Sequence, residues 1–133
     1  MTQPRGIRNC NPGNIRLSGD KWKGLRPQQT DGEFCQFTDM AHGYRALIRL
    51  LQNYRKLHGC RTIADFIRRW APEHENNTAA YITAVCQKMQ VPSTYEPDTD
   101  DRDTMTVFAA AISEVENGIP AQTADIRAGW ELL

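Results

Sequence analysis

A change in apolar spacing near residue 39 constrains the fold of this 133-residue chain more than any other feature. Before that point, residues 5–37 are rich in Asn, Pro, Gly, Asp and Ser, which favour turns. After it, apolar residues recur every three or four positions, as they do along one face of an α-helix. The first such series is Met40, Tyr44, Leu47, Leu51 and Tyr54. The sequence therefore predicts an irregular N-terminal part followed by a helical body.

Residues that commonly cap helices divide this body into five expected helices. Ser, Thr, Asp and Asn side chains accept hydrogen bonds from the first turn, and Gly tolerates the left-handed backbone after the last turn. The third helix has Ile82, Val85, Cys86 and Met89 as its apolar line. The expected limits are Asp39 to about Leu57 before Gly59, Thr62 to a stop at Pro72, Asn77 or Thr78 onward, Asp100 or Asp101 to Asn117 with Gly118 as cap, and Thr123 to Leu132.

The N-terminal part contains two short candidate strands, Asn14–Leu17 and Glu33–Phe37, which we expect to form a small β-hairpin lobe. The chain length suits one domain, so we expect residues 1–133 to fold as a single unit. The expected fold class is mainly α, or α+β, with about five helices.

Charge and composition narrow the classes of partner. Sixteen Lys and Arg balance sixteen Asp and Glu, so the strong basic excess of many nucleic-acid-binding proteins is absent. Six basic residues against Asp20 in residues 1–26 nevertheless suit an anionic polymer, or simply a solvated surface. No apolar run approaches the roughly 20 residues of a membrane span, and the first residues do not resemble a signal peptide. We expect no nucleic-acid partner and no membrane insertion.

Glu116 is the most informative acidic residue, because a helical wheel places it among apolar side chains. At about 100° per residue, Glu116 falls about 40° from Ile112, whereas Glu114 falls about 200° away. Glu116 also occupies the last turn, at the negative end of the helix dipole. Loss of water and the dipole both disfavour the charged carboxylate, which suits a general acid. The structural alternative is a side chain that extends to solvent at the helix end.

Asp31 and Glu33 are candidates for a second catalytic acid, since glycosidases often use two carboxyl groups. Both residues lie in the turn and strand of the expected hairpin. Asp31 followed by Gly32 is also a common turn pair, so a structural role stays open.

The segment from Arg8 to Arg16 is dense in amide and guanidinium groups around a Pro-Gly turn. Such groups hydrogen-bond sugar hydroxyls, N-acetyl groups and carboxylates, although Asn side chains equally stabilise turns. Trp22 and Tyr81 are candidates for stacking on sugar rings, or else core aromatics. The substrate-binding candidates are Asn11, Asn14, Arg16, Trp22 and Tyr81.

Other chemistries find less support in the sequence. No His-Glu-x-x-His motif is present, so a zinc peptidase is disfavoured. The four cysteines are widely spaced and indicate neither a zinc site nor a disulfide framework. Cys35 with His74 is a candidate thiol–imidazole pair, but Cys35 falls in a strand-like run and not at a helix start.

Short motifs follow one another along nearly the whole chain. In order they are Arg5-Gly6-Ile7-Arg8-Asn9, Asn11-Pro12-Gly13-Asn14-Ile15-Arg16, Trp22-x-Gly24, Asp31, Phe34-x-x-Phe37, Gly43-Tyr44-Arg45-Ala46, Trp70-Ala71-Pro72, Glu75-Asn76-x-Thr78-x-x-Tyr81 and Glu116-Asn117-Gly118. As an ordered set they resemble a family of phage and prophage proteins described as virion structural proteins, endolysins or lysozyme-like muralytic enzymes. The resemblance implies a lysozyme-like fold and a peptidoglycan target.

A more distant similarity bears on mechanism. In flagellar-type glucosaminidases, a helix ending in Glu-Ser-Gly precedes an Asn-rich loop, a hairpin and a helix with a Tyr, and lytic transglycosylases also end their catalytic helix with Glu-Ser. Here the loop at Asn11–Arg16 and Tyr81 precede Glu116. We interpret the chain as a circular permutation of a lysozyme-like domain, because domain termini often lie close together. The similarity implies that Glu116 is the catalytic acid and that Tyr81 and Asn14 line the groove.

The expected function is cleavage of peptidoglycan glycan strands by a lytic transglycosylase or a muramidase, without metal or organic cofactor. The alternatives are a non-catalytic virion structural or peptidoglycan-binding module and, less favoured, a peptidoglycan peptidase that uses Cys35. The expected partners are glycan strands and other virion proteins. We expect synthesis in the bacterial cytoplasm and action in the periplasm or cell wall, after release through a holin or as part of a virion.

Overall fold

Six helices account for most of the computed structural model, which describes residues 3–133. They are α1 (Arg5–Arg8), α2 (Met40–His58), α3 (Ile63–Trp70), α4 (Thr78–Met89), α5 (Arg102–Asn117) and α6 (Thr123–Glu131). The last five are the helices expected from the capping pattern, and the four-residue α1 is an addition. The prediction of a mainly helical protein is confirmed. Within residues 3–133, no helix combines the length and apolar character needed to cross a membrane.

The helix ends lie where the capping residues predict them. At α3, Thr62 and Asp65 form a reciprocal capping box, in which each side chain accepts a hydrogen bond from the other's backbone N–H. Gly59 and Gly118 end α2 and α5 with φ angles of 67° and 70°, in the left-handed region. The N-cap side chains that accept a bond from the first turn are those of Asp39, Thr62, Asn77 and Asp101.

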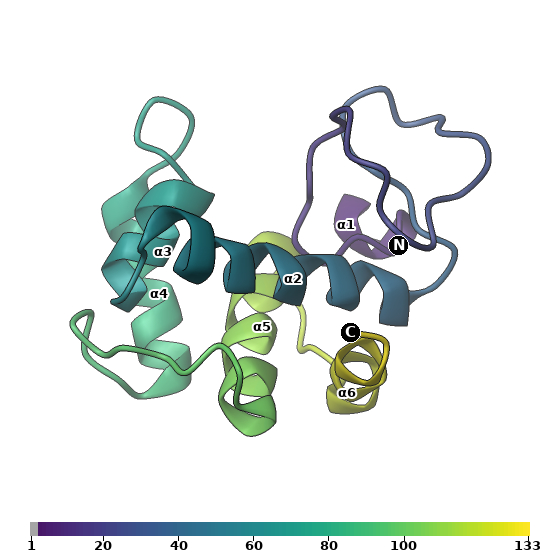
Figure 1. Ribbon diagram of the computed structural model, residues 1–133. Helices are drawn as coiled ribbons and strands as arrows, with labels where there is room; N and C mark the ends of the chain where they lie inside the picture. The colour runs from purple at the N-terminus through teal and green to yellow at the C-terminus, as the bar shows by residue number, and fades with distance from the viewer. Residues whose placement is uncertain (1–2) are drawn as a thin grey trace.

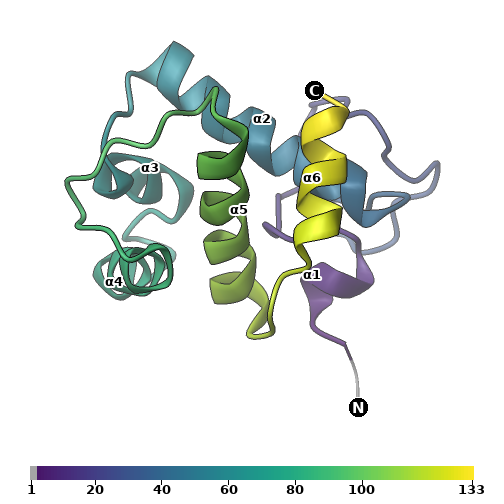
Figure 2. The ribbon, with the colours of Figure 1, turned by 90° about the horizontal axis from the view of Figure 1, so that it is seen from below.

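Helix α2 crosses the whole molecule and joins its two sides (Figure 1). Helices α3 and α4 lie at its C-terminal end, α5 passes beneath its middle, and α6 packs along its N-terminal half (Figure 2). The main hydrophobic core lies between these helices and includes Tyr44, Leu47 and Leu51 from the predicted apolar face of α2. Burial of this face explains why the helices assemble around α2.

The buried face of α4 is wider than the predicted apolar line. Thr78, Tyr81 and Val85 are the buried residues of this helix. The other predicted members of the line, Ile82, Cys86 and Met89, are partly buried and pack against the core. The predicted line therefore packs on the core, and the polar Tyr81 is buried beside it.

Residues 3–38, here called the N-terminal lobe, contain two isolated antiparallel bridges where the sequence predicts a hairpin. Arg16 pairs with Phe34, and Leu25 pairs with Phe37. The expected strands do lie beside each other, but no continuous strand forms among the described residues. A small apolar cluster joins the lobe to α2 and is formed by Ile15, Cys35 and Phe37 of the lobe with Ala46 of α2.

Buried amide side chains hold the N-terminal lobe together in place of a strand ladder. The Asn11 amide donates to the carbonyl oxygens of Ile15 and Cys35, both at 2.9 Å, and accepts from the Ile15 N–H. The Gln36 side chain accepts from the backbone N–H of Thr30. Both amides are buried, so these bonds compensate the polar groups that leave water.

Candidate functional site

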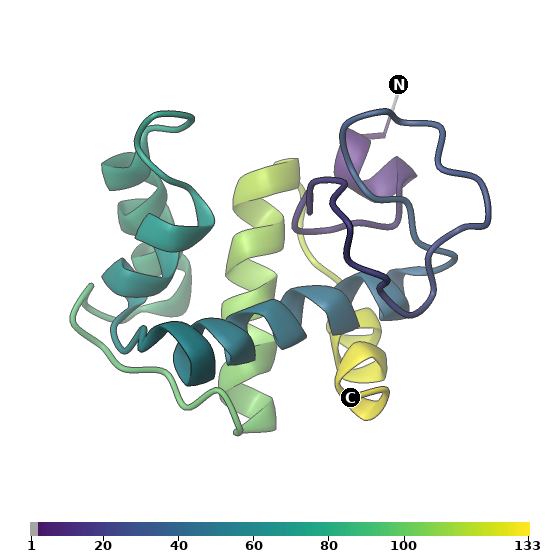
Figure 3. The ribbon, with the colours of Figure 1, turned by 45° about the horizontal axis from the view of Figure 1, so that its top comes forward.

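A cleft of about 340 Å³ opens between the N-terminal lobe and the α3–α4 lobe, which comprises residues 60–91. Figure 3 shows the two lobes rising from the two ends of α2, with the C-terminal end of α5 between them. We call this the central cleft. It is lined by residues 13–16 and Phe34 of the N-terminal lobe, Leu50 and Tyr54 of α2, residues 69–72, Glu75 and Asn76, and Glu116 of α5.

The half-buried carboxylate of Glu116 contacts both lobes. Its Oε1 accepts a hydrogen bond of 2.9 Å from Asn14 Nδ2 in the N-terminal lobe. Its Oε2 accepts a hydrogen bond of 2.7 Å from the hydroxyl of Tyr81 in α4. Three residues that the sequence singled out therefore form one cluster, namely Asn14, Tyr81 and Glu116.

The apolar face of α5 directs Glu116 into the cleft. Ile112, one turn earlier on the same face, is completely buried, and Gly118 ends the helix two residues later. The neighbouring Asn117 donates from Nδ2 to the carbonyl oxygen of Pro12 and to that of Ser113, both at 2.9 Å. The bond to Pro12 fixes the end of α5 to the N-terminal lobe, whereas the bond to Ser113 lies within α5.

Asn14 reaches Glu116 from a left-handed backbone conformation with φ of 48°. Asn adopts this region more readily than most residues. Its backbone N–H donates to the Asn11 carbonyl oxygen at 3.0 Å, which closes the Asn-Pro-Gly-Asn turn. Its Oδ1 is buried without a hydrogen-bond partner in the described chain and lies against Gly6, where a Cβ atom would approach within 2.9 Å.

Tyr81 is a fixed donor from the other lobe. Only 8% of its surface is exposed, and this burial, together with the charge of Glu116, raises the pKa of its hydroxyl above the ordinary value. The hydroxyl therefore keeps its proton across the physiological range. When Glu116 is charged the hydroxyl donates to it, and when Glu116 is neutral the same oxygen accepts from it.

Asp31 has a structural role in the N-terminal lobe. Its carboxylate accepts from Arg5 Nε at 2.8 Å, from Asn9 Nδ2 at 2.9 Å, and from the backbone N–H groups of Glu33 and Phe34. The hydrogen bonds from Arg5 and Asn9 hold the pKa of Asp31 well below its usual range. Asp31 does not line the central cleft, so the structure does not bring this predicted second acid to Glu116.

Glu33 also lies outside the lining of the cleft. It is exposed and forms an ion pair with Arg16 at 3.4 Å and a longer one with Arg5 at 4.0 Å. Both acids of the expected pair are thus engaged with arginines of their own lobe.

The remaining predicted substrate-binding residues separate into two groups. Arg16 lines the central cleft, as expected. Asn11 is completely buried with its amide used inside the lobe, and Trp22 packs against the small apolar cluster with its indole nitrogen buried. These two residues support the lobe and do not line the cleft.

Cys35 is not placed as a nucleophile. It is buried, its thiol donates to the Arg16 carbonyl oxygen at 3.5 Å, and burial raises the pKa of the thiol. A raised pKa disfavours the thiolate that a cysteine peptidase requires. Among residues 3–133, no group of three or more His, Cys, Asp or Glu side chains is arranged to hold a metal ion.

The structure adds three polar residues that sequence reasoning did not propose for the site. Arg69, Glu75 and Asn76 all line the central cleft. Glu75 and Asn76 belong to one of the motifs that carry the family resemblance, and that motif could have indicated them as site residues. No such motif includes Arg69, so only the fold shows that it lines the cleft.

The fold and the site define a small, mainly helical protein with a carboxylate held between two lobes. The chain is 36% identical over 131 residues to Protein P5 of Pseudoalteromonas phage PM2, an alignment that covers 96% of this chain and 80% of that protein. The chain belongs to the same family as this phage protein. No protein-family model matches the chain.

Proposed function

We propose that this protein cleaves the glycan strand of peptidoglycan, with Glu116 as the general acid and base. The observation that carries the proposal is the position of Glu116, half-buried in a cleft between two lobes and in contact with a donor from each. The resemblance to lysozyme-like muralytic proteins and the membership of a phage protein's family support the same conclusion. The loop that precedes the acid-bearing helix fits a circularly permuted lysozyme-like domain.

The proposed reaction breaks the β-1,4 bond between N-acetylmuramic acid and N-acetylglucosamine. The neutral carboxyl group of Glu116 gives its proton to the glycosidic oxygen as the bond from the muramyl C1 breaks. The resulting carboxylate takes the proton of the muramyl 6-hydroxyl as O6 bonds to C1. The products are a 1,6-anhydromuramyl end and a free 4-hydroxyl, and no water is consumed.

This lytic transglycosylase route agrees best with the geometry, because it needs only one carboxylate. A muramidase would instead activate a water molecule, commonly with a second carboxylate across the cleft. Asp31 and Glu33 do not line the cleft, and each is paired with an arginine. Tyr81 assists the single carboxylate by donating to its charged form and accepting from its neutral form.

The second candidate is a peptidoglycan-binding or virion structural module without turnover. It is favoured by the two hydrogen bonds that Glu116 already accepts, one from each lobe, since a carboxylate in this arrangement can hold the lobes together without turnover. Under either candidate we propose that the protein acts at the cell wall, either after release at lysis or as a virion component.

The test is digestion of isolated sacculi with purified protein, followed by mass spectrometry of the soluble products. We expect anhydro-muropeptides from the wild type, none from Glu116→Gln, and normal release from Cys35→Ser as the control. Reducing muramyl ends would indicate hydrolysis, and free peptide termini would indicate a peptidase. Binding without release by the wild type, or full activity of Glu116→Gln, would refute the catalytic proposal.

A further inference from the structure

Arg69 at the end of α3 is a cation in the central cleft without a carboxylate partner. Among residues 3–133, no Asp or Glu oxygen lies within 4.0 Å of its guanidinium nitrogens. It lines the same cleft as Glu116. An unpaired guanidinium in the cleft that also holds a candidate catalytic carboxylate is available to a ligand.

Two aromatic neighbours from α2 hold this guanidinium in place. Its central carbon lies 5.3 Å from the centre of the Tyr54 ring, and Nη2 lies 3.1 Å from His58 Nε2. Stacking on an aromatic ring and a hydrogen bond reduce the rotamer freedom that a surface arginine would otherwise lose on binding. The remaining N–H groups stay free for a carboxylate.

The opposite wall carries a similar arrangement. Arg16 of the N-terminal lobe lines the cleft, and its guanidinium lies 5.3 Å from the centre of the Phe34 ring. Arg16 also forms an exposed ion pair with Glu33 at 3.4 Å, which a competing carboxylate can replace because exposed pairs are weak. A polymer in the cleft thus passes between two oriented guanidinium groups.

We propose that Arg69, assisted by Arg16, binds carboxylates of the peptide stems that peptidoglycan carries on its muramyl residues. This inference rests on the proposed function and specifies its substrate, namely glycan strands that retain their stems. While the stem is attached, the lactyl carboxyl group of each muramyl residue is an amide, so the carboxylates of such a strand are those of its stems. Arg is suited to this task because its planar fork binds a carboxylate through two parallel hydrogen bonds.

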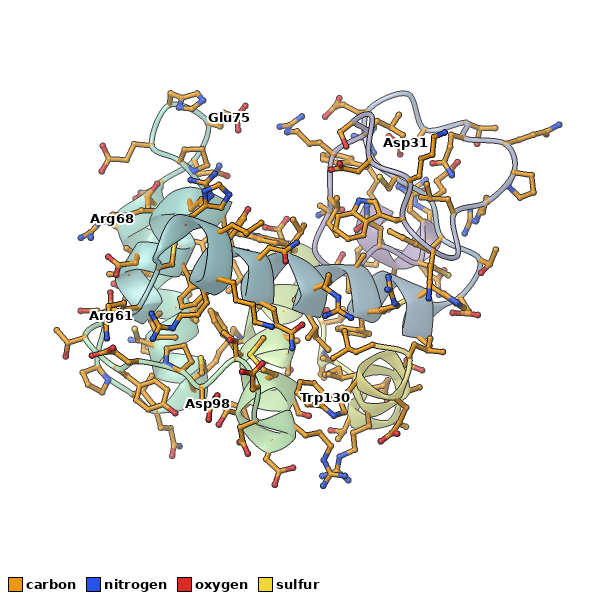
Figure 4. The ribbon with its side chains drawn as sticks, viewed as in Figure 1. Asp31, Arg61, Arg68, Glu75, Asp98 and Trp130 are labelled. Atoms are coloured by element: carbon orange, nitrogen blue, oxygen red, sulfur yellow. The ribbon has the colours of Figure 1, made fainter. Side chains whose placement is uncertain are left out.

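Arg68 provides a matched control in the same turn of α3. It is exposed, carries the same charge and does not line the central cleft. Figure 4 shows Arg68 on the outer side of the α3–α4 lobe, whereas Glu75 lies at the end that rises beside the cleft. Glutamine at either position removes one charge, but only the change at Arg69 removes it from the cleft.

The experiment compares initial release rates from two polymers, namely intact sacculi and the same glycan strands stripped of their peptides by an amidase, with the lactyl carboxylates that the amidase exposes then converted to amides by a carbodiimide and ammonium. We expect the wild type to favour stem-bearing strands about tenfold, the value of one charge-assisted hydrogen bond. Arg69→Gln should bring the ratio of the two rates close to one, Arg69→Lys should restore it in part, and Arg68→Gln should leave it unchanged. A wild-type ratio of one, or an unaltered ratio in Arg69→Gln, would overturn the inference.

The same polymers separate this inference from the proposed function. If the wild type cleaves neither polymer, the proposed function fails, and co-sedimentation then measures binding in place of release. Selective loss of binding to stem-bearing polymer in Arg69→Gln would still support stem recognition. Equal binding of both polymers by the wild type would refute it.

Discussion

Replacement of Gly6 by Ala tests how closely the N-terminal lobe is fitted to the end of α5. An ideal Cβ at this buried position would lie 2.3 Å from Asn117 Oδ1, 2.8 Å from the Asn11 carbonyl oxygen and 2.9 Å from Asn14 Oδ1. All three distances are far below ordinary carbon–oxygen contact, so either α1 moves outward or Asn117 rotates.

The expected loss of folding free energy follows from these two alternative rearrangements. Rotation of Asn117 breaks its bonds to Pro12 and Ser113, each contributing about 1 kcal/mol, and a shift of α1 costs about 1–3 kcal/mol as overpacking. Alanine recovers up to about 1 kcal/mol because it favours helix more than glycine. The net loss is about 1 kcal/mol for either rearrangement, which lowers the melting temperature by about 3–5 °C for a chain of this length.

Thermal unfolding followed by far-UV circular dichroism measures this loss. Gly19→Ala is the control, because Gly19 is exposed and a Cβ there would meet nothing within 4 Å. The control should shift stability by less than about 0.5 kcal/mol. Equal melting temperatures for the two variants would show that α1 is not packed against Asn117 as described.

Two further variants test the site and its support. Tyr81→Phe removes the donor to Glu116 Oε2 and should lower product release from sacculi about 10- to 100-fold, because a hydrogen bond to a charged group contributes about 1.5–3 kcal/mol. The far-UV spectrum should be unchanged, and wild-type release rates would exclude a role for the hydroxyl. Asp31→Asn should be less stable than wild type at pH 7 in urea unfolding, since Arg5 depresses the pKa of Asp31 only in the folded state. The contribution of the Asp31 carboxylate to the free energy of unfolding is present above the ordinary pKa of about 3.9 and is lost as the pH falls. The difference in this free energy between the wild type and Asp31→Asn should therefore narrow below about pH 4. A difference independent of pH would contradict the ion pair.

Local signals in the sequence were sufficient to predict helices α2 to α6. Asp39, Thr62 and Asp101 cap with their own side chains, and each bond joins residues only three positions apart. The predicted apolar line of α4 packs on the core, and Thr78 and Tyr81 are buried beside it. The bond of Tyr81 to Glu116 joins residues 35 positions apart and leaves no trace in the local spacing.

Long-range pairing explains the other differences. Asp31 is held by Arg5 across 26 residues, and the sequence pattern of a turn carries no trace of that partner. The two segments of the predicted hairpin pair only through isolated bridges, and buried amides such as those of Asn11 and Gln36 bond other parts of the lobe's backbone. For Glu116, by contrast, the helical wheel was informative because α5 is long and one face is buried.

The cluster around Glu116 joins residues 102 and 35 positions apart in the chain. A nascent or truncated polypeptide that lacks α5 has the Asn14 loop and Tyr81 but no carboxylate between them. The cluster therefore assembles only after the residues up to the end of α5 have emerged from the ribosome. Recovery of function during refolding should consequently report the last step of tertiary assembly and lag behind helix formation.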